Sequence, residues 1–139
     1  MVHALEEIRR VLIPDGLLID LRPILDKWPV EVVWSGGRRV TGKLTDLPAA
    51  LADDAASNNA MEEAIRQGWF DSENKSIFPV FLYWNDPEDM RLDMMEKWSD
   101  LTTLGEATLQ ATLTAWAAAG DNKRVRVKMK LLLSALKKR

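Results

Sequence analysis

The segment between residues 124 and 133 has an alternating pattern that constrains the fold more than any other part of the sequence. Up to residue 130 every second residue is basic, and the residues between are Val125, Val127 and Met129. Successive side chains of a strand point to opposite faces of a sheet, so this spacing predicts a strand with one basic and one apolar face. Leu131–Leu133 extends the strand. The chain must therefore fold around a sheet.

Charge is distributed unevenly along the chain. Residues 122–139 contain eight basic and no acidic residues, whereas residues 45–121 contain four basic and fifteen acidic ones. We expect the basic strand to lie near acidic helices, which would neutralise its charge and make nucleic-acid binding weak. The alternative is that its basic face binds anions or nucleic acid, which requires that face to be exposed to solvent. The residues of this face are Arg124, Arg126, Lys128 and Lys130.

Helical and strand patterns alternate along the rest of the sequence. Apolar residues at helical spacing predict a helix over Leu5–Leu12, ended by Pro14-Asp15-Gly16, and an apolar strand follows at Gly16–Leu21. The remaining patterns predict a β-hairpin over residues 30–44, a helix from Asp46 to about Gln67 with a break at Ser57–Asn59, a strand over residues 76–84, a helix after Asp86-Pro87, and a helix to Gly120 that starts with a Thr103–Glu106 capping box. We therefore expect an α/β fold, with a small mixed sheet, flanking helices and a β-hairpin insertion.

Composition excludes several classes of site. The 139 residues suit one domain and contain no linker or repeat, so we predict a single domain over residues 1–139. With no cysteine and a single histidine, His3, the chain has no zinc–thiolate site and no site built from two histidines. No apolar run reaches the ~18 residues of a membrane span, and no signal-peptide pattern is present. We expect a cytoplasmic protein without a membrane partner.

The opening segment carries the most specific motif. Residues 10–16 read Arg-Val-Leu-Ile-Pro-Asp-Gly and lead from a helix into the strand Gly16–Leu21. This segment resembles class I S-adenosylmethionine-dependent methyltransferases, in which a helix ending in Arg-Val-Leu-x-Pro-Gly-Gly precedes the fifth strand of a seven-stranded sheet. Asp15 replaces the first glycine, and aspartate tolerates the left-handed turn conformation better than most residues. The resemblance implies that the strands over 76–84 and 124–133 are the sixth and seventh, with residues 24–75 as an insertion.

The cofactor-binding half of that fold has no counterpart in the sequence. In the family, a Gly-rich turn and an acidic residue that holds the ribose precede the segment that is similar. The seven glycines of this chain include no Gly-x-Gly spacing, so no phosphate-cradling motif is present. The resemblance therefore implies a truncated Rossmann-like fold. It also implies that the isolated chain binds no cofactor, and that S-adenosylmethionine binds only if the missing half is supplied.

Asp20 and Arg22 are the best-placed candidates for a binding site. Both lie at the C-terminal end of the first predicted strand, and ligands of open α/β sheets bind beyond the carboxyl ends of strands. We predict that they bind substrate; the alternative is that they pair with neighbouring side chains and stabilise the strand end. No catalytic, cofactor-binding or metal-binding residue is predicted.

The other candidates have structural interpretations. His3 is expected on the surface, because no nucleophile or orienting carboxylate accompanies it. Four acidic residues near a predicted helix start are expected to favour that helix end rather than bind a metal: Asp86, Glu88, Asp89 and Asp93. Trp98 and Trp116 fall on apolar helical stripes and are expected in the core. Three other tryptophans are candidates for lining a pocket or an interface: Trp28, Trp34 and Trp69.

These observations favour a non-catalytic function. We predict a methyltransferase-like C-terminal fragment that acts as an interaction or dimerisation module and forms a homodimer through the edge of Gly16–Leu21. That strand would lack its neighbouring fourth strand, and no lysine or proline within it protects the edge. The hairpin over residues 30–44 is an alternative cover for the edge. The main alternative function is the substrate-side half of a split methyltransferase, which is an enzyme only when the N-terminal half is supplied in trans.

Overall fold

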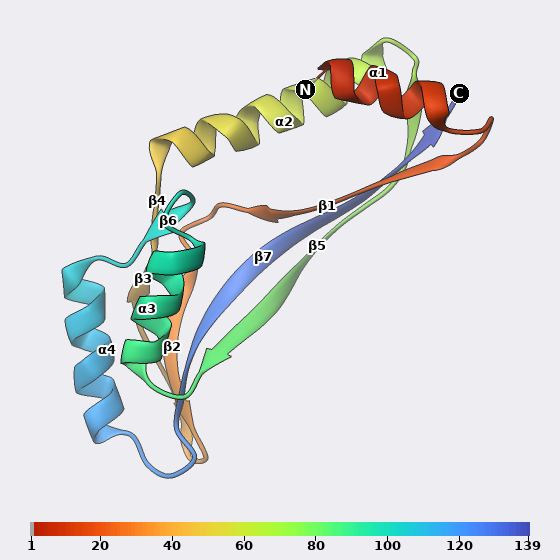
Figure 1. The fold of residues 1–139 in the computed structure, drawn as a ribbon. Coiled ribbons are helices and arrows are strands. Elements are labelled where there is room, and N and C mark those ends of the chain that lie inside the picture. Colours follow the sequence, from red (N-terminus) through yellow and green to blue (C-terminus); the bar gives the residue numbers. More distant parts are fainter. Residues whose placement is uncertain (1) are drawn as a thin grey trace. The chain divides into compact units, whose positions relative to one another are not determined.

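The computed structural model describes residues 2–139, which form four helices and seven strands (Figure 1). In chain order these are α1 (Val2–Val11), β1 (Leu17–Ile24), β2 (Pro29–Trp34), β3 (Gly37–Lys43), β4 (Thr45–Asp46), α2 (Pro48–Arg66), β5 (Phe70–Trp84), α3 (Pro87–Lys97), β6 (Thr102–Thr103), α4 (Glu106–Ala118) and β7 (Arg124–Lys138). The expected mixed α/β fold is confirmed, with a mostly antiparallel sheet. The chain forms two compact units, each with its own hydrophobic core.

The first unit contains parts of three strands of a five-stranded sheet, in which β7 lies between β1 and β5. This unit consists of residues 2–24, 52–78 and 131–139. The N–H of Lys138 donates to the carbonyl of Gly16 at 2.8 Å, and the N–H of Arg139 donates to the carbonyl of Trp69 at 3.2 Å. The end of β7 therefore meets the starts of both β1 and β5, so β7 runs antiparallel to each.

The helices α1 and α2 lie on one side of this sheet (Figure 1). Between the helices and the sheet lies a small core, formed by Leu5, Ala60, Ala64, Phe70 and Leu136. The small alanine side chains let α2 approach the strands closely, and the larger Leu5 and Phe70 fill the remaining space. The core of the first unit is thus built on one face of its sheet.

The second unit contains the predicted hairpin and the other two long helices. It consists of residues 25–51 and 79–130. β2 and β3 pair antiparallel, from Pro29 opposite Lys43 to Trp34 opposite Gly37, which confirms the hairpin. β2 also pairs antiparallel with the first half of β7, and the second half of β5 follows the other side of β7. The short strands β4 and β6 form a separate antiparallel pair.

The helices α3 and α4 cover one face of the second unit's sheet. Its core is formed by Trp28, Val30, Leu44, Met90, Met94, Val125 and Val127, and Trp84, Trp98 and Trp116 pack against this cluster. Trp98 and Trp116 thus lie where their helical stripes predict. The expectation that Trp28 lines a pocket or interface is wrong: its side chain is 1% exposed. It follows directly after a loop, and its ring turns inward to meet the edge of Trp98 at 5.7 Å between centroids.

Local signals explain several element ends. Asp86 caps α3, because its Oδ1 accepts a hydrogen bond from the N–H of Asp89 at 2.8 Å, and Pro87 occupies the first turn. Asp15 has a φ of 61°, in the left-handed region, where it makes the turn between α1 and β1.

Other element ends differ from expectation. α2 runs unbroken through residues 57–59, because the hydroxyl of Ser57 donates to the carbonyl of Asp53 at 2.9 Å and stays within the helix. The capping box at the start of α4 is wrong: Gly105 is the N-cap, without a side-chain hydrogen bond, and Thr103 belongs to β6. The two long strands extend further than predicted, to Phe70 at the start of β5 and Lys138 at the end of β7.

Candidate functional site at the edge of β1

Asp20 and Arg22 form the centre of a polar cluster in the first unit. Their side chains, 18% and 17% exposed, are joined by a hydrogen bond of 3.0 Å from Arg22 Nε to Asp20 Oδ2. The Arg22 guanidinium also donates to Asp54 Oδ1 at 3.3 Å and to Asn58 Oδ1 at 2.6 Å, both on α2. The hydroxyl of Ser134 on β7 donates to Asp20 Oδ2 at 3.3 Å. The cluster therefore ties β1 to both α2 and β7.

A cavity of about 250 Å³ lies next to this cluster. Asp20 and Arg22 line it together with Ala4, Leu5, Ile8, Leu18, Ile19, Ser57 and Met61. Its walls are mostly apolar, and the two charged side chains provide polar groups. Because the guanidinium already donates to three side chains, Arg22 is held in place and presents a fixed charge. The cavity suits an apolar side chain or small apolar group.

The backbone of β1 offers a second feature at the same place. The carbonyl of Gly16 points toward β7, so in an antiparallel ladder Leu17, Ile19 and Leu21 direct their N–H and C=O groups to the other side. Within the first unit, β7 is the only strand of the described chain that pairs with β1. The three residues whose backbone groups point to the free edge also have exposed apolar side chains. The free edge of β1 and the adjoining cavity together form the candidate site.

Sequence reasoning found part of this site and missed the rest. It identified Asp20, Arg22 and the apolar strand, and the structure brings these together. It missed Asp54, Asn58 and Ser134, which the fold places beside Arg22 and Asp20. The spacing of Asp54 and Asn58 by four residues puts both on one side of α2, but nothing in the sequence shows which strand that side meets.

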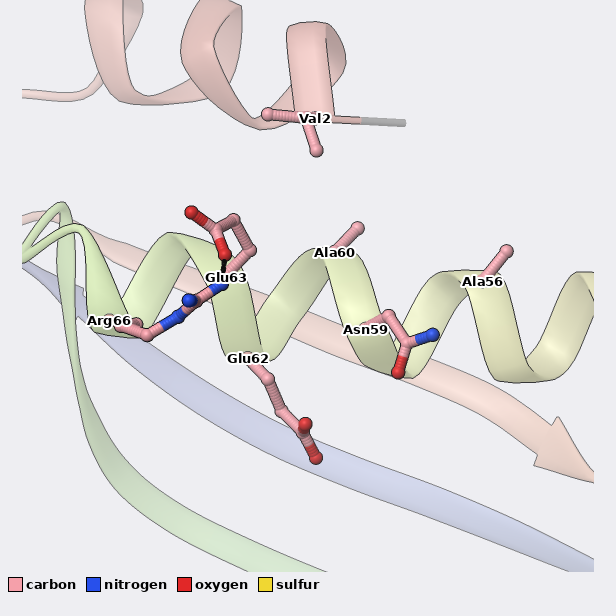
Figure 2. A pocket seen from close by; sticks show the side chains of 7 residues that line it. All are labelled: Val2, Ala56, Asn59, Ala60, Glu62, Glu63 and Arg66. Atoms are coloured by element: carbon pink, nitrogen blue, oxygen red, sulfur yellow. Dashed lines mark ion pairs between the residues drawn. The ribbon is translucent and has the colours of Figure 1, made fainter.

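A second cavity, of about 640 Å³, lies between the start of α1 and one side of α2 (Figure 2). Ala56 and Ala60 point toward Val2 there, whereas Glu62 points away from it (Figure 2). Glu63 and Arg66 at its end form an ion pair within α2. The methyl groups of this cavity and the ion pair between Glu63 and Arg66 provide no chemistry for a reaction, so this cavity is not a candidate site.

The remaining sequence candidates have structural contacts. His3 lies on the surface of α1, as expected, with its Nδ1 3.2 Å from Glu6 Oε2. Glu88 pairs with Arg91, and Asp93 pairs with Lys97 at 2.5 Å and accepts a hydrogen bond from the Trp84 indole at 3.0 Å. Within residues 2–139, no group of three or more His, Asp or Glu side chains could hold a metal ion.

Three carboxylates have lowered pKa values: Asp26, Glu88 and Asp93. A hydrogen bond from Lys130, together with its charge, lowers the pKa of Asp26, and hydrogen bonds from Lys97 and Trp84 lower the pKa of Asp93. A pKa that is lower in the folded state means that the ionised form stabilises the fold. This stabilisation is complete above the ordinary carboxyl pKa of about 4 and is lost as the pH falls through the folded-state value.

We therefore expect the effect of Asp93→Asn on stability to depend on pH. At neutral pH the variant loses the contacts of the carboxylate with Lys97, so its urea midpoint should lie below that of the wild type. As the pH falls below about 4 and through the lowered pKa of Asp93, the wild-type carboxyl becomes protonated, so the two midpoints should converge. Urea titrations followed by circular dichroism at several pH values measure this difference. A difference that stays constant on acidification would contradict the assignment.

Comparison with known proteins gives no further assignment: no family model, curated protein or solved structure matches the chain. In the part of the chain that the structure describes, none of the helices combines the length and apolar character needed to cross a membrane.

Proposed function

We propose that this protein is a non-catalytic interaction module with a methyltransferase-like fold, and that it pairs with a second copy of itself through the free edge of β1. The main support is that the side chains along this edge are apolar. Leu17, Ile19 and Leu21 are 55%, 55% and 58% exposed. Pairing two edges across a twofold axis would satisfy the backbone groups and set these side chains beside those of the second copy on the same face of the sheet, which partly covers them.

The position of β1 supports the resemblance to the C-terminal half of methyltransferases. The resemblance implies that the last strand lies beside the strand that follows the Pro14-Asp15-Gly16 turn, and β7 does pair with β1. It also implies a fourth strand on the other side of β1. That other side is the free edge, so the second copy would occupy the place of the fourth strand in a truncated Rossmann-like sheet.

The extent of the pairing follows from one residue. β1 continues to Ile24 and includes Pro23, two positions beyond the apolar run. Pro23 follows the alternation of Leu17, Ile19 and Leu21, so it faces the free edge and has no N–H to donate there. Pairing is therefore confined to residues 17–21, which forms a short ladder, and the adjoining cavity beside Ile8 and Met61 can accept an apolar side chain of the second copy.

Sedimentation equilibrium at micromolar concentrations tests the proposal. The wild-type protein should sediment at about twice the 15.7 kDa of one chain. Ile19→Lys, which puts a charge at the centre of the pairing segment, should sediment as a monomer. Leu92→Lys is the matched control, since Leu92 is 52% exposed on α3 in the other unit, and it should sediment as the wild type does.

Amide hydrogen exchange adds a readout specific to backbone pairing. The amides of Leu17, Ile19 and Leu21 should exchange more slowly as the protein concentration rises, because they become donors in the dimer. A wild-type monomer, an Ile19→Lys dimer or exchange that is independent of concentration would each overturn the proposal.

The split-methyltransferase alternative is supported by a different observation, namely that Asp20 and Arg22 line a cavity at the same edge. In that case the free edge of β1 receives the fourth strand of a separate N-terminal half rather than a second copy. The cavity would then lie on the substrate side of the assembled enzyme.

A further inference from the structure

The basic side chains of β7 face away from the helices of the second unit. Val125 and Val127 pack into the core with Met90 and Met94 of α3. Because strand side chains alternate between faces, Arg124, Arg126, Lys128 and Lys130 lie on the opposite face of the sheet. The expectation that the basic strand lies against acidic helices is therefore wrong, and its charge is not neutralised by them.

The basic side chains of β7 and the acidic side chains of α3 lie on opposite faces of the second unit's sheet, although Tyr83 of β5 lines a hollow together with Asp89, Asp93 and Glu96. The acidic side chains of α3 are Glu88, Asp89, Asp93 and Glu96, and the helix packs against the apolar face through its methionines. On the other face, Arg38 of β3 lies opposite Val33 of β2, which in turn lies opposite Arg124 of β7. Arg38 therefore belongs to the same face as the basic residues of β7. We call Arg38, Arg124, Arg126, Lys128 and Lys130, with Phe81 and Tyr83, the basic face.

Two carboxylates offset part of this charge. Glu31, whose side chain is 4% exposed, pairs with Arg126 and lies 3.6 Å from Arg38. Asp26 pairs with Lys130, and the charges of Lys43 and Lys27 also act on it. Five cations against two carboxylates leave an excess of three positive charges on the basic face. Arg124 is exposed. In the part of the chain that the structure describes, neither Arg124 nor Lys128 of β7 is paired with a carboxylate.

Two aromatic rings of β5 lie among these cations. The Arg126 guanidinium lies 4.5 Å from the Phe81 ring centroid and donates to the Tyr83 hydroxyl at 3.2 Å. The Arg124 guanidinium lies 5.4 Å from the Tyr83 ring. The Arg126 guanidinium also lies 6.0 Å from the Tyr83 ring centroid, and Tyr83 remains 45% exposed. The basic face thus presents one accessible ring beside cations that can approach a phosphate.

We propose that the basic face binds a short segment of single-stranded nucleic acid, with phosphates on Arg38, Arg124 and Lys128 and a base stacked against Tyr83. Its excess charge complements a polyanion, and sheet faces that carry exposed rings between basic side chains stack unpaired bases. The exposed ring favours nucleic acid over an anionic lipid surface or a sulfated polysaccharide, because these offer negative charge but no flat base for Tyr83 to stack on.

Fluorescence anisotropy with a labelled oligo-dT of about 12 nucleotides tests this proposal. Three phosphate contacts predict that the logarithm of the binding constant falls with the logarithm of the salt concentration with a slope of about −2. Arg124→Glu/Lys128→Glu should lower the affinity about tenfold or more and flatten the slope. Tyr83→Leu, which keeps the charges, should lower the affinity about fivefold and leave the slope unchanged.

The matched control is Arg10→Glu/Lys75→Glu, which makes the same change in net charge at exposed positions of the first unit. It should bind within about twofold of the wild type, and circular dichroism establishes that all variants are folded. An absence of binding at low salt, or an equal loss in the control, would overturn the proposal. If Tyr83→Leu binds as the wild type does, and heparin or phosphatidylserine vesicles compete equally, the face binds polyanions in general and the assignment to single-stranded nucleic acid is wrong.

Discussion

Replacing Trp28 with alanine is expected to lower the free energy of unfolding by about 3–5 kcal/mol, since the substitution removes a buried aromatic side chain and leaves a cavity. Trp28 is 1% exposed and is the largest fully buried side chain of the second unit. Its ring meets the edge of Trp98, whose ring meets Trp84 at 5.9 Å between centroids. The loss of Trp28 therefore removes one of the two ring contacts of Trp98.

Urea unfolding followed by circular dichroism measures this loss. Trp34→Ala serves as the control, because Trp34 is only half-buried and packs beside the glycines of its own hairpin turn. It should cost clearly less than Trp28→Ala. A loss below about 1 kcal/mol for Trp28→Ala would place this side chain outside the core.

Arg126→Ala is expected to destabilise the protein by about 3 kcal/mol or more, mainly through the partner that it leaves behind. Glu31 is 4% exposed in its side chain, and Arg126 is its close ion-pair partner. Removing one member of a buried pair strands the other charge in a poorly solvated place, which costs about 3–5 kcal/mol. The remaining partner, Arg38, lies 3.6 Å away and is 64% exposed, so it compensates only weakly.

Two further variants separate this effect from a general loss of positive charge. Arg38→Ala should cost less than about 1 kcal/mol, because its pair with Glu31 is screened by water. Adding Glu31→Gln to Arg126→Ala should restore part of the lost stability, because the stranded charge is then absent. Equal effects of the two arginine substitutions on the urea midpoint would contradict this account of the pair.

Local patterns in the sequence predicted individual elements better than their partners. The alternation in β7, the Asp86-Pro87 start of α3 and the Ser35-Gly36-Gly37 turn depend on interactions between near neighbours, and each element is present. The partners of Arg22 lie 32 and 36 positions away on α2. The periodicity of neither segment specifies which residues of α2 contact Arg22, because these contacts depend on which face of α2 packs on the sheet.

The basic strand β7 is a second case in which the sequence predicted an element but not its neighbours. The sequence reveals that basic and acidic residues are segregated, but not which layer of the fold receives each group. That outcome depends on the packing of Val125 and Val127 against Met90 and Met94, which turns the cations to the far side. Similarly, Trp28 lies in a loop-like sequence and is buried by residues that are distant along the chain. The segregation of charge was predictable from the sequence, whereas the face of the sheet on which the basic side chains lie was not.

The pairing of β1 with the end of β7 has a consequence for how the protein acquires its structure during synthesis. Asp20 and Ser134, which contact each other across the two strands, are 114 positions apart. The ribosome therefore releases Leu17–Leu21 long before their partner strand exists. Contacts of such large sequence separation form slowly, and an apolar strand that waits for its partner is prone to aggregate. Chaperones that bind short apolar segments would have their main opportunity at this strand, in the interval between the synthesis of β1 and that of β7.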